Sequence, residues 1–284
     1  MSSRRRSGRA EKAPRIPFVA RPFAGLPGET DWVALREVVP AATAPLSLKD
    51  GTPVLLSTVL PMQWPGMVRS DGRRYLGLQV ASRSGDASRD LAAVLEDLVT
   101  AEPGTSVVTT DLPGPGARLQ DLLTDAPLEV TLHDGFDFWV EGTEDPDGSV
   151  AESIQTSMEA ANASVVPTAK LTGVESAYWC RMRERSHLRW VLPHDEEPLL
   201  DALARMSVAG GLGLGEGTRF VGSFRAHGLL VPVWDLPLET GADDVEEPAR
   251  AWADRLTEAL GESGLSDQAR RARQGLVNRQ LTLR

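Results

Sequence analysis

The hydrophobic and polar positions of this chain predict short strands interspersed with amphipathic helices. Over residues 86–99 the apolar residues recur at helical spacing, so that they share one face. Apolar runs of strand length lie on either side of Asp50-Gly51, a dipeptide typical of the turn in a β-hairpin. Helix and strand signals mixed in this way indicate an α+β fold.

The same patterns give the approximate position of each expected element. We expect helices at residues 31–38, 86–99, 119–123, 150–164, 196–208, 248–260 and 266–275. We expect strands at residues 46–48, 54–60, 75–80, 107–109, 128–132, 136–140, 168–171, 177–182, 187–192, 219–224 and 229–233. Asp134-Gly135 separates two of these strands and predicts a second hairpin.

The order of the elements divides the chain into two similar mixed α/β lobes. Residues 1–30, rich in Arg, Ser, Pro and Gly, are expected to form a basic and largely disordered arm. The first lobe takes residues 31–140, the acidic segment 141–149 is a linker loop, and residues 150–284 form the second lobe with the C-terminal helices. Each lobe resembles an α-β-β-β-α unit, which suggests an internal duplication with an insertion at residues 64–72. Chance similarity between two α+β segments is the alternative.

Composition favours a cytoplasmic globular protein. Of its 284 residues, 41% are hydrophobic and 25% charged, which suffices for a sizeable core. No apolar stretch approaches the roughly 20 residues of a membrane helix, and no apolar segment follows the N-terminal arginines as in a secretory signal. The single cysteine, Cys180, lies in an apolar run and is expected to be a core thiol. Arg181 and Arg183 keep a reactive thiol as the alternative.

Charge is distributed unevenly between the arm and the rest of the chain. Residues 1–21 hold seven basic side chains and one acidic one, a net charge of +6. Because the whole chain carries −10, residues 22–284 carry −16. A basic arm attracts an acidic partner, so we expect weak contact with nucleic acid or a ribosome through its arginines. The arginines chosen for this role are Arg4, Arg5, Arg6 and Arg9.

The sequence motifs give no reason to expect a metal or a cofactor. The glycine-rich stretch 210–217 follows a predicted helix and precedes a predicted strand, the reverse of the order in a phosphate-binding loop. The four histidines form no tight ligand pair, and acidic residues after His194 suit a helix start without a metal. The turn at 145–149 lacks the Gly and Glu of a calcium loop.

Two clusters are the candidate sites. Arg225 and His227 lie in a predicted hairpin turn, with Asp235 further along, and together they could bind an anion or transfer a proton; an ordinary turn is the alternative. The second cluster surrounds Trp64, beside Pro and Gly and between Met62 and Met67, a composition that suits a protein-contact patch. A loop that packs onto its own lobe is the alternative.

Six segments have a distinctive combination of residues: Ile16 to Phe23, Thr58 to Pro61, His133 to Trp139, Leu188 to Asp195, Ala226 to Asp235 and Arg279 to Arg284. Together they resemble an uncharacterised family of actinobacterial proteins, a domain of unknown function, over essentially the whole chain. Members of that family sometimes carry labels such as preprotein translocase or topoisomerase. This sequence has neither the Walker loop of a translocase ATPase nor a tyrosine outside an apolar strand context.

The sequence therefore predicts a non-enzymatic interaction or accessory protein in the cytoplasm. It would use the basic arm and a protein-contact surface such as the Trp64 loop, with an unknown protein partner and no membrane. The competing hypothesis is an enzyme or a small-ligand sensor without a local signature, whose site lies between the lobes at the Arg225–His227 loop. A homodimer or purely structural role is a third.

Overall fold

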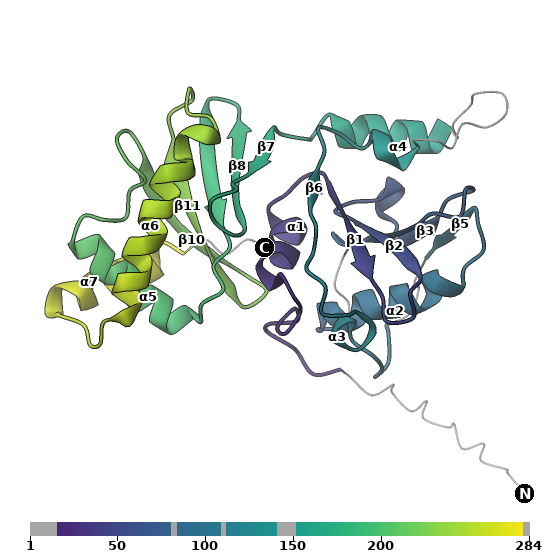
Figure 1. The fold of residues 1–284 in the computed structure, drawn as a ribbon, viewed down its shortest axis with the longest axis horizontal. Coiled ribbons are helices and arrows are strands. Elements are labelled where there is room, and N and C mark those ends of the chain that lie inside the picture. The colour runs from purple at the N-terminus through teal and green to yellow at the C-terminus, as the bar shows by residue number, and fades with distance from the viewer. Residues whose placement is uncertain (1–15, 81–83, 109–111, 141–151, 281–284) are drawn as a thin grey trace, which may run out of the picture.

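The structure, a computed structural model, describes residues 16–80, 84–108, 112–140 and 152–280 (Figure 1). Within these residues the chain forms two β-sheets and seven α-helices, which confirms the α+β class. The two sheets lie on opposite sides of the first helix (Figure 1). α2 (Ala87–Thr100) packs on the same face of the first sheet as this helix, α4 (Glu152–Asn162) lies on the other face of that sheet, and α5 (Glu196–Val208) and α6 (Asp243–Gly261) cover the outer face of the second sheet.

The first sheet has six strands in the order β5-β3-β4-β2-β1-β6. Their bounds are β1 Ala42–Ser47, β2 Pro53–Ser57, β3 Gly66–Val68, β4 Arg74–Gly77, β5 Thr105–Val107 and β6 Thr131–Leu132. β1 and β2 form the predicted antiparallel hairpin. In its turn Gly51 takes a φ of 78°, which favours glycine, and the Thr52 amide donates to the Asp50 carboxylate at 2.9 Å. β2 and β4 run parallel.

The second sheet has five strands in the order β10-β11-β9-β8-β7, and every neighbouring pair is antiparallel. Their bounds are β7 Thr168–Lys170, β8 Ala177–Met182, β9 Arg185–Trp190, β10 Arg219–Ala226 and β11 Leu229–Leu236. Side chains alternate between the two faces of each strand. On β9, Leu188 and Trp190 face the outer helices, so Arg185, His187 and Arg189 lie on the face turned toward the first lobe.

The helices are α1 Glu29–Glu37, α2 Ala87–Thr100, α3 Leu119–Leu122, α4 Glu152–Asn162, α5 Glu196–Val208, α6 Asp243–Gly261 and α7 Asp267–Asn278. Two single turns of 3-10 helix, η1 Pro61–Gln63 and η2 Asp137–Trp139, lie in the first lobe. The capped helix that the periodicity predicts is α2. The Asp86 side chain caps it by accepting from the Ser88 amide at 3.1 Å.

One hydrophobic core joins the two lobes. It contains buried residues of α1, α2 and one face of the first sheet, together with Tyr178 and Val231 of the second sheet and Val191, which directly follows β9. Of the residues assigned to the arm, 16–30 are described, and Phe23 in this segment is fully buried in the same core. The lobes are thus packed together around α1, as Figure 1 shows.

A buried polar network adds to this contact. The Asp31 carboxylate on α1 accepts hydrogen bonds from Lys170 Nζ at 2.7 Å, Ser176 Oγ at 2.7 Å and the Tyr178 hydroxyl at 2.9 Å. Burial raises the pKa of Tyr178, and the Asp31 charge raises it further, so the hydroxyl remains a donor. The first turn of α1 is therefore fixed to β7 and β8.

The prediction of a second hairpin at Asp134-Gly135 is wrong. Residues 137–139 form the helical turn η2, and β6 pairs with β1 rather than with a following strand. The reason is the spacing of the buried rings: Phe136 and Trp139 are three residues apart and enter the same cluster. A strand would place them on opposite faces of the sheet, whereas a helical turn places them on one side.

The two lobes can be compared by their strand order. In the first lobe β4 lies next to β2 of the β1–β2 hairpin, and in the second lobe β9 lies next to β8 of the β7–β8 pair. The additional strands run in different directions, because β4 is parallel to its neighbour and β9 antiparallel. The segment 64–72, expected to be an insertion, contributes β3 to the first sheet. The internal duplication stays a prediction, and the linker 141–149 lies outside the described residues.

Candidate ligand pocket beneath α4

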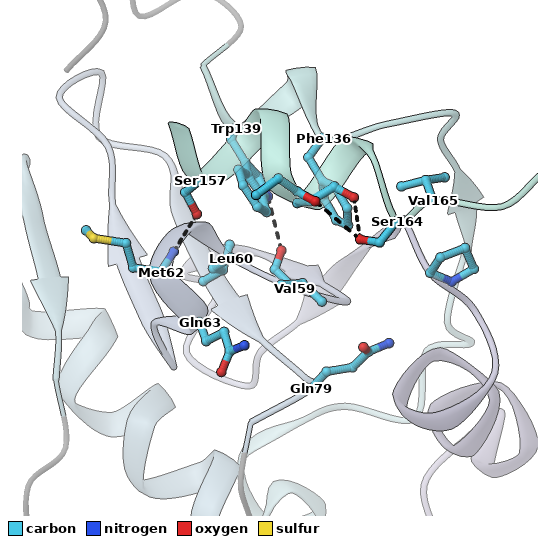
Figure 2. A pocket seen from close by; sticks show the side chains of 13 residues that line it. Val59, Leu60, Met62, Gln63, Gln79, Phe136, Trp139, Ser157, Ser164 and Val165 are labelled. Atoms are coloured by element: carbon cyan, nitrogen blue, oxygen red, sulfur yellow. Dashed lines mark hydrogen bonds between the residues drawn. The ribbon is translucent and has the colours of Figure 1, made fainter. Parts of the chain in front are cut away.

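A pocket of about 580 Å³ lies between α4 and the segments that enter and leave the strands at one end of the first sheet (Figure 2). Its described lining residues come from five separate segments: the α1–β1 connection, the chain around η1, the chain after β4, the chain around η2, and α4 with the turn after it. They are Pro40, Val59, Leu60, Met62, Gln63, Gln79, Phe136, Trp139, Ser157, Ala160, Ala161, Ser164 and Val165.

α4 and the turn after it contribute a stripe of mostly small side chains. The stripe has spacings of three and four residues along one helix face, and its members are Ser157, Ala160, Ala161, Ser164 and Val165. Small side chains leave space between the helix and the sheet. Met158 is the one residue of α4 that is buried, so few contacts attach this helix to the lobe.

Two aromatic rings form the buried side of the pocket. Phe136 is 3% exposed and Trp139 is 2% exposed, and their ring centroids are 4.6 Å apart. The indole Nε1 of Trp139 donates to the carbonyl oxygen of Val59 at 3.0 Å, which fixes the ring (Figure 2). This part of the wall is rigid and apolar.

The opposite wall is the loop around η1, and its backbone is strained. Met62 and Gln63 have φ angles of 52° and 56°, in the left-handed region that non-glycine residues rarely adopt. The Met62 amide donates to Ser157 Oγ at 2.9 Å and so connects this loop to α4 (Figure 2). Gly77 allows the backbone of this loop to approach β4 closely, because a Cβ at this position would lie 2.7 Å from the Trp64 carbonyl oxygen.

The polar groups of the pocket are uncharged amides and hydroxyls. The Gln79 side chain donates from Nε2 to the carbonyl oxygens of Leu35 at 2.7 Å and Val39 at 2.9 Å. Its Oε1 accepts no hydrogen bond from the described residues, and the side-chain amide of Gln63 forms none with them, although the Gln63 backbone N–H donates to the carbonyl oxygen of Leu60. These two amides can therefore bind the polar group of a ligand.

Ionisable side chains do not occur among the described residues that line the pocket. General acid–base catalysis needs a group that can take or release a proton. Within the described ranges, no group of three or more His, Cys, Asp or Glu is placed to hold a metal ion. The described lining thus consists of apolar side chains with a few amides and hydroxyls.

The structure places the three residues of the predicted contact patch differently. Met62 lines the pocket and is 48% exposed, whereas Met67 is 6% exposed and points into the core from β3. Trp64 is half-buried and packs against the cluster around Trp139. The loop thus packs on its own lobe and also forms one side of the pocket.

The three residues of the other predicted site are not brought together. Arg225 forms a bidentate pair with Glu196, with Nε 2.6 Å from the carboxylate, and the imidazole Nε2 of His227 is 2.7 Å from Glu37 Oε1. Asp235 is at the far end of the β10–β11 hairpin, where it pairs with Arg219. Seven residues of extended strand, about 23 Å, separate that end from the turn.

Two further predictions concern the arginines of the arm and the single cysteine. Arg4, Arg5, Arg6 and Arg9 lie outside the described residues. Cys180 is buried, and burial raises the pKa of its thiol, with the charge of Arg189 opposing the shift. The expected core thiol is thus confirmed as buried.

Sequence reasoning missed the pocket. Its lining comes from segments that no local motif connects, and only folding brings them together. One signal was present in the chain: the small residues of 157–164 recur on the helix face where a surface helix usually carries large apolar residues.

Comparison with known proteins places the chain in a family. A family model described as "Family of unknown function (DUF5926)" matches residues 22–284. The chain belongs to DUF5926. No curated protein and no solved structure matches it. Membership of DUF5926 confirms the resemblance to a domain of unknown function, and nearly the whole described fold lies within the match.

None of the described helices is both long and apolar enough to cross a bilayer.

Proposed function

We infer that this protein is a non-enzymatic binding protein that holds an uncharged, largely apolar small molecule beneath α4. The observation that carries this proposal is the composition of the pocket wall, in which aromatic and aliphatic side chains are combined with amides and hydroxyls. A volume of about 580 Å³ suits a small organic ligand. Burial of its apolar surface supplies the affinity, and Gln63 and Gln79 select the polar group.

The accessory role expected from the sequence is compatible with this pocket. Met62 is exposed at the pocket while its backbone amide binds Ser157 of α4. A ligand that occupied the pocket would contact both the η1 loop and α4, and so would change the surface that these two segments offer to a protein partner. Contact between the basic arm and nucleic acid or a ribosome, and a cytoplasmic location, are further parts of this proposal.

An enzyme or sensor site between the lobes has less geometric support. It requires Arg225, His227 and Asp235 to converge, and each of these side chains instead binds a different partner. The pocket beneath α4 needs no such rearrangement.

The test is the binding of Nile red, an uncharged dye whose fluorescence rises in apolar surroundings. The variant Ala160→Trp fills the pocket from α4 with a side chain on an already exposed position. We expect it to weaken dye binding at least tenfold, because the indole occupies the space that the dye needs. Equilibrium dialysis of the dye against the full chain measures the affinity directly.

The matched control is Ala163→Trp. Ala163 is also exposed and is one residue past α4, but it is not among the residues that line the pocket. Its dye affinity should stay within twofold of the parent protein. If the two variants weakened binding equally, or if the parent protein did not bind the dye, the pocket would not be the site of an apolar ligand.

A further inference from the structure

A second cluster lies on the face of the second sheet that is turned toward the first lobe. Its side chains are charged, whereas the described residues that line the pocket beneath α4 are uncharged. The strand register brings its members together: His187 on β9 pairs with Asp235 on β11, which pairs with Arg219 on β10. Arg185 is two residues before His187 on the same face of β9. His187, Asp235 and Arg219 thus form a polar row across three strands, beyond the apolar part of the face, and Arg185 lies beside this row.

Asp235 is the centre of this row. Its side chain is 12% exposed, and its two oxygens are shared among three basic groups. Oδ2 accepts hydrogen bonds from Arg185 Nη1 at 3.2 Å and from Arg219 Nη2. The imidazole Nδ1 of His187 lies 3.1 Å from Oδ1. One buried carboxylate therefore holds two guanidinium groups at the same oxygen atom.

The two arginines use only a small part of their donor capacity there. A guanidinium has five N–H donors. Arg185 and Arg219 each form one hydrogen bond with the described residues, both to Asp235, and their side chains are 61% and 68% exposed. The remaining donors of two adjacent guanidinium groups are free to bind an oxyanion between them, and arginine pairs bind phosphate oxygens in this way.

The charge of the surroundings also favours an anion. Burial lowers the pKa of His187, with Asp235 opposing and Arg189 and Arg185 assisting, so the imidazole is neutral at pH 7. Three arginines on this part of the molecule, Arg185, Arg189 and Arg219, then lie near two carboxylates, those of Asp235 and Glu184, so positive charge exceeds negative charge by one.

A shallow depression of about 380 Å³ gives access to the cluster. Arg185, Arg219 and Asp235 line it, and Glu184 contributes the one other charged side chain among its described lining residues. Leu238, 45% exposed, lies at its edge. The depression thus combines two arginines bound to Asp235 with the apolar side chains of Leu236, Pro237 and Leu238, which suits a small organic phosphate better than a bare ion.

We propose that Arg185 and Arg219, positioned by Asp235, form a binding site for the phosphate group of a small phosphorylated molecule. The site is separate from the pocket beneath α4, with which it shares no described residue. Either can therefore be tested while the other stays intact.

The experiment is calorimetric titration of the full chain with phenyl phosphate and with inorganic phosphate at constant ionic strength. The double variant Arg185→Gln with Arg219→Gln should weaken phenyl phosphate binding at least tenfold. The control is Arg250→Gln with Arg270→Gln, which removes two charges from side chains that are 50% and 61% exposed on α6 and α7. Its affinity should stay within twofold of the parent protein.

A third variant separates a positioned site from a merely positive surface. Asp235→Asn removes one negative charge, which makes the surface more positive, but it also removes the carboxylate that aligns both arginines, so a positioned site predicts weaker binding. Stronger binding by this variant would overturn the proposal, as would equal losses in the two double variants. Binding of chloride as tight as that of phosphate would also overturn it. Circular dichroism of each variant checks that the fold is retained.

Discussion

The outer faces of the two sheets are covered in different ways. On the second sheet, α5 buries six residues and α6 buries five, and the rings of Trp190, Trp234 and Trp252 contact one another at centroid distances of 5.0–6.4 Å. On the first sheet, α4 buries Met158 alone and leaves a pocket of about 580 Å³. A tightly packed layer stabilises a lobe, whereas a loosely packed one can admit a ligand.

The faces of the two sheets that are turned toward each other differ in polarity. The first sheet is apolar toward α1 and α2, whereas the second sheet continues past α1 into the charged row around Asp235. The chain thus has a neutral pocket in its first lobe and a cluster of arginines in its second. Two sites of such different chemistry are suited to two different ligands.

The largest expected effect tests the contrast between the outer layers. Trp252 is fully buried among two other tryptophans, so Trp252→Ala should lower the free energy of unfolding by about 3–5 kcal/mol. Met158→Ala should lower the free energy of unfolding by no more than about 2 kcal/mol, because Met158 is the one buried residue of α4 and the loss should stay local to that helix. Urea denaturation of both variants measures the difference, and hydrogen exchange shows whether the protection lost in Met158→Ala is confined to α4. Equal losses of global stability would contradict the contrast.

An intermediate effect is expected where the lobes meet. Asp31→Ala removes the shared hydrogen-bond acceptor of Lys170, Ser176 and Tyr178. It should lower the free energy of unfolding by about 2–3 kcal/mol. The weakened contact should also separate the unfolding of the two lobes into two transitions in calorimetry. The control is Asp195→Ala, whose side chain is 81% exposed and binds Arg21, with an expected change below about 1 kcal/mol. A single, unshifted transition in Asp31→Ala would show that the lobes do not depend on this network.

The smallest effect is a pH dependence at the other end of α1. The hydrogen bond from His227 is the main cause that lowers the pKa of Glu37 below its ordinary value of 4.5, against the opposing effect of burial. A carboxylate whose pKa is lower in the folded state contributes stability above its unfolded pKa and loses it as the pH falls through the folded value. The contribution should therefore decline below pH 4.5.

The matched variant for this prediction is His227→Ala. It should flatten the dependence of stability on pH at and below pH 4.5, which thermal denaturation across the acid range can measure. An unchanged slope in the acid range would mean that the contact between Glu37 and His227 does not connect the lobes in solution.

Much of the local structure followed from short-range patterns. α5 spans residues 196–208, the bounds that its periodicity and its acidic start predicted, and the β1–β2 hairpin has its turn at Asp50-Gly51 as expected. These elements have a strong local signal, namely an apolar face at helical spacing or a turn that only certain residues favour. The strand predicted at residues 136–140 was wrong. Its alternation of large residues suits a strand, but the burial of Phe136 and Trp139 in one cluster requires a helical turn.

The sequence alone determined the α+β class, most of the elements and the membership of a family of unknown function. Only the tertiary structure decided which faces meet around α1, that Arg225 and Asp235 lie far apart, and that a pocket opens beneath α4. The physical reason is that helix and turn preferences act over a few residues and are written in them. A pocket or a shared carboxylate depends instead on side chains brought together from distant segments, and its geometry is set by how those segments pack.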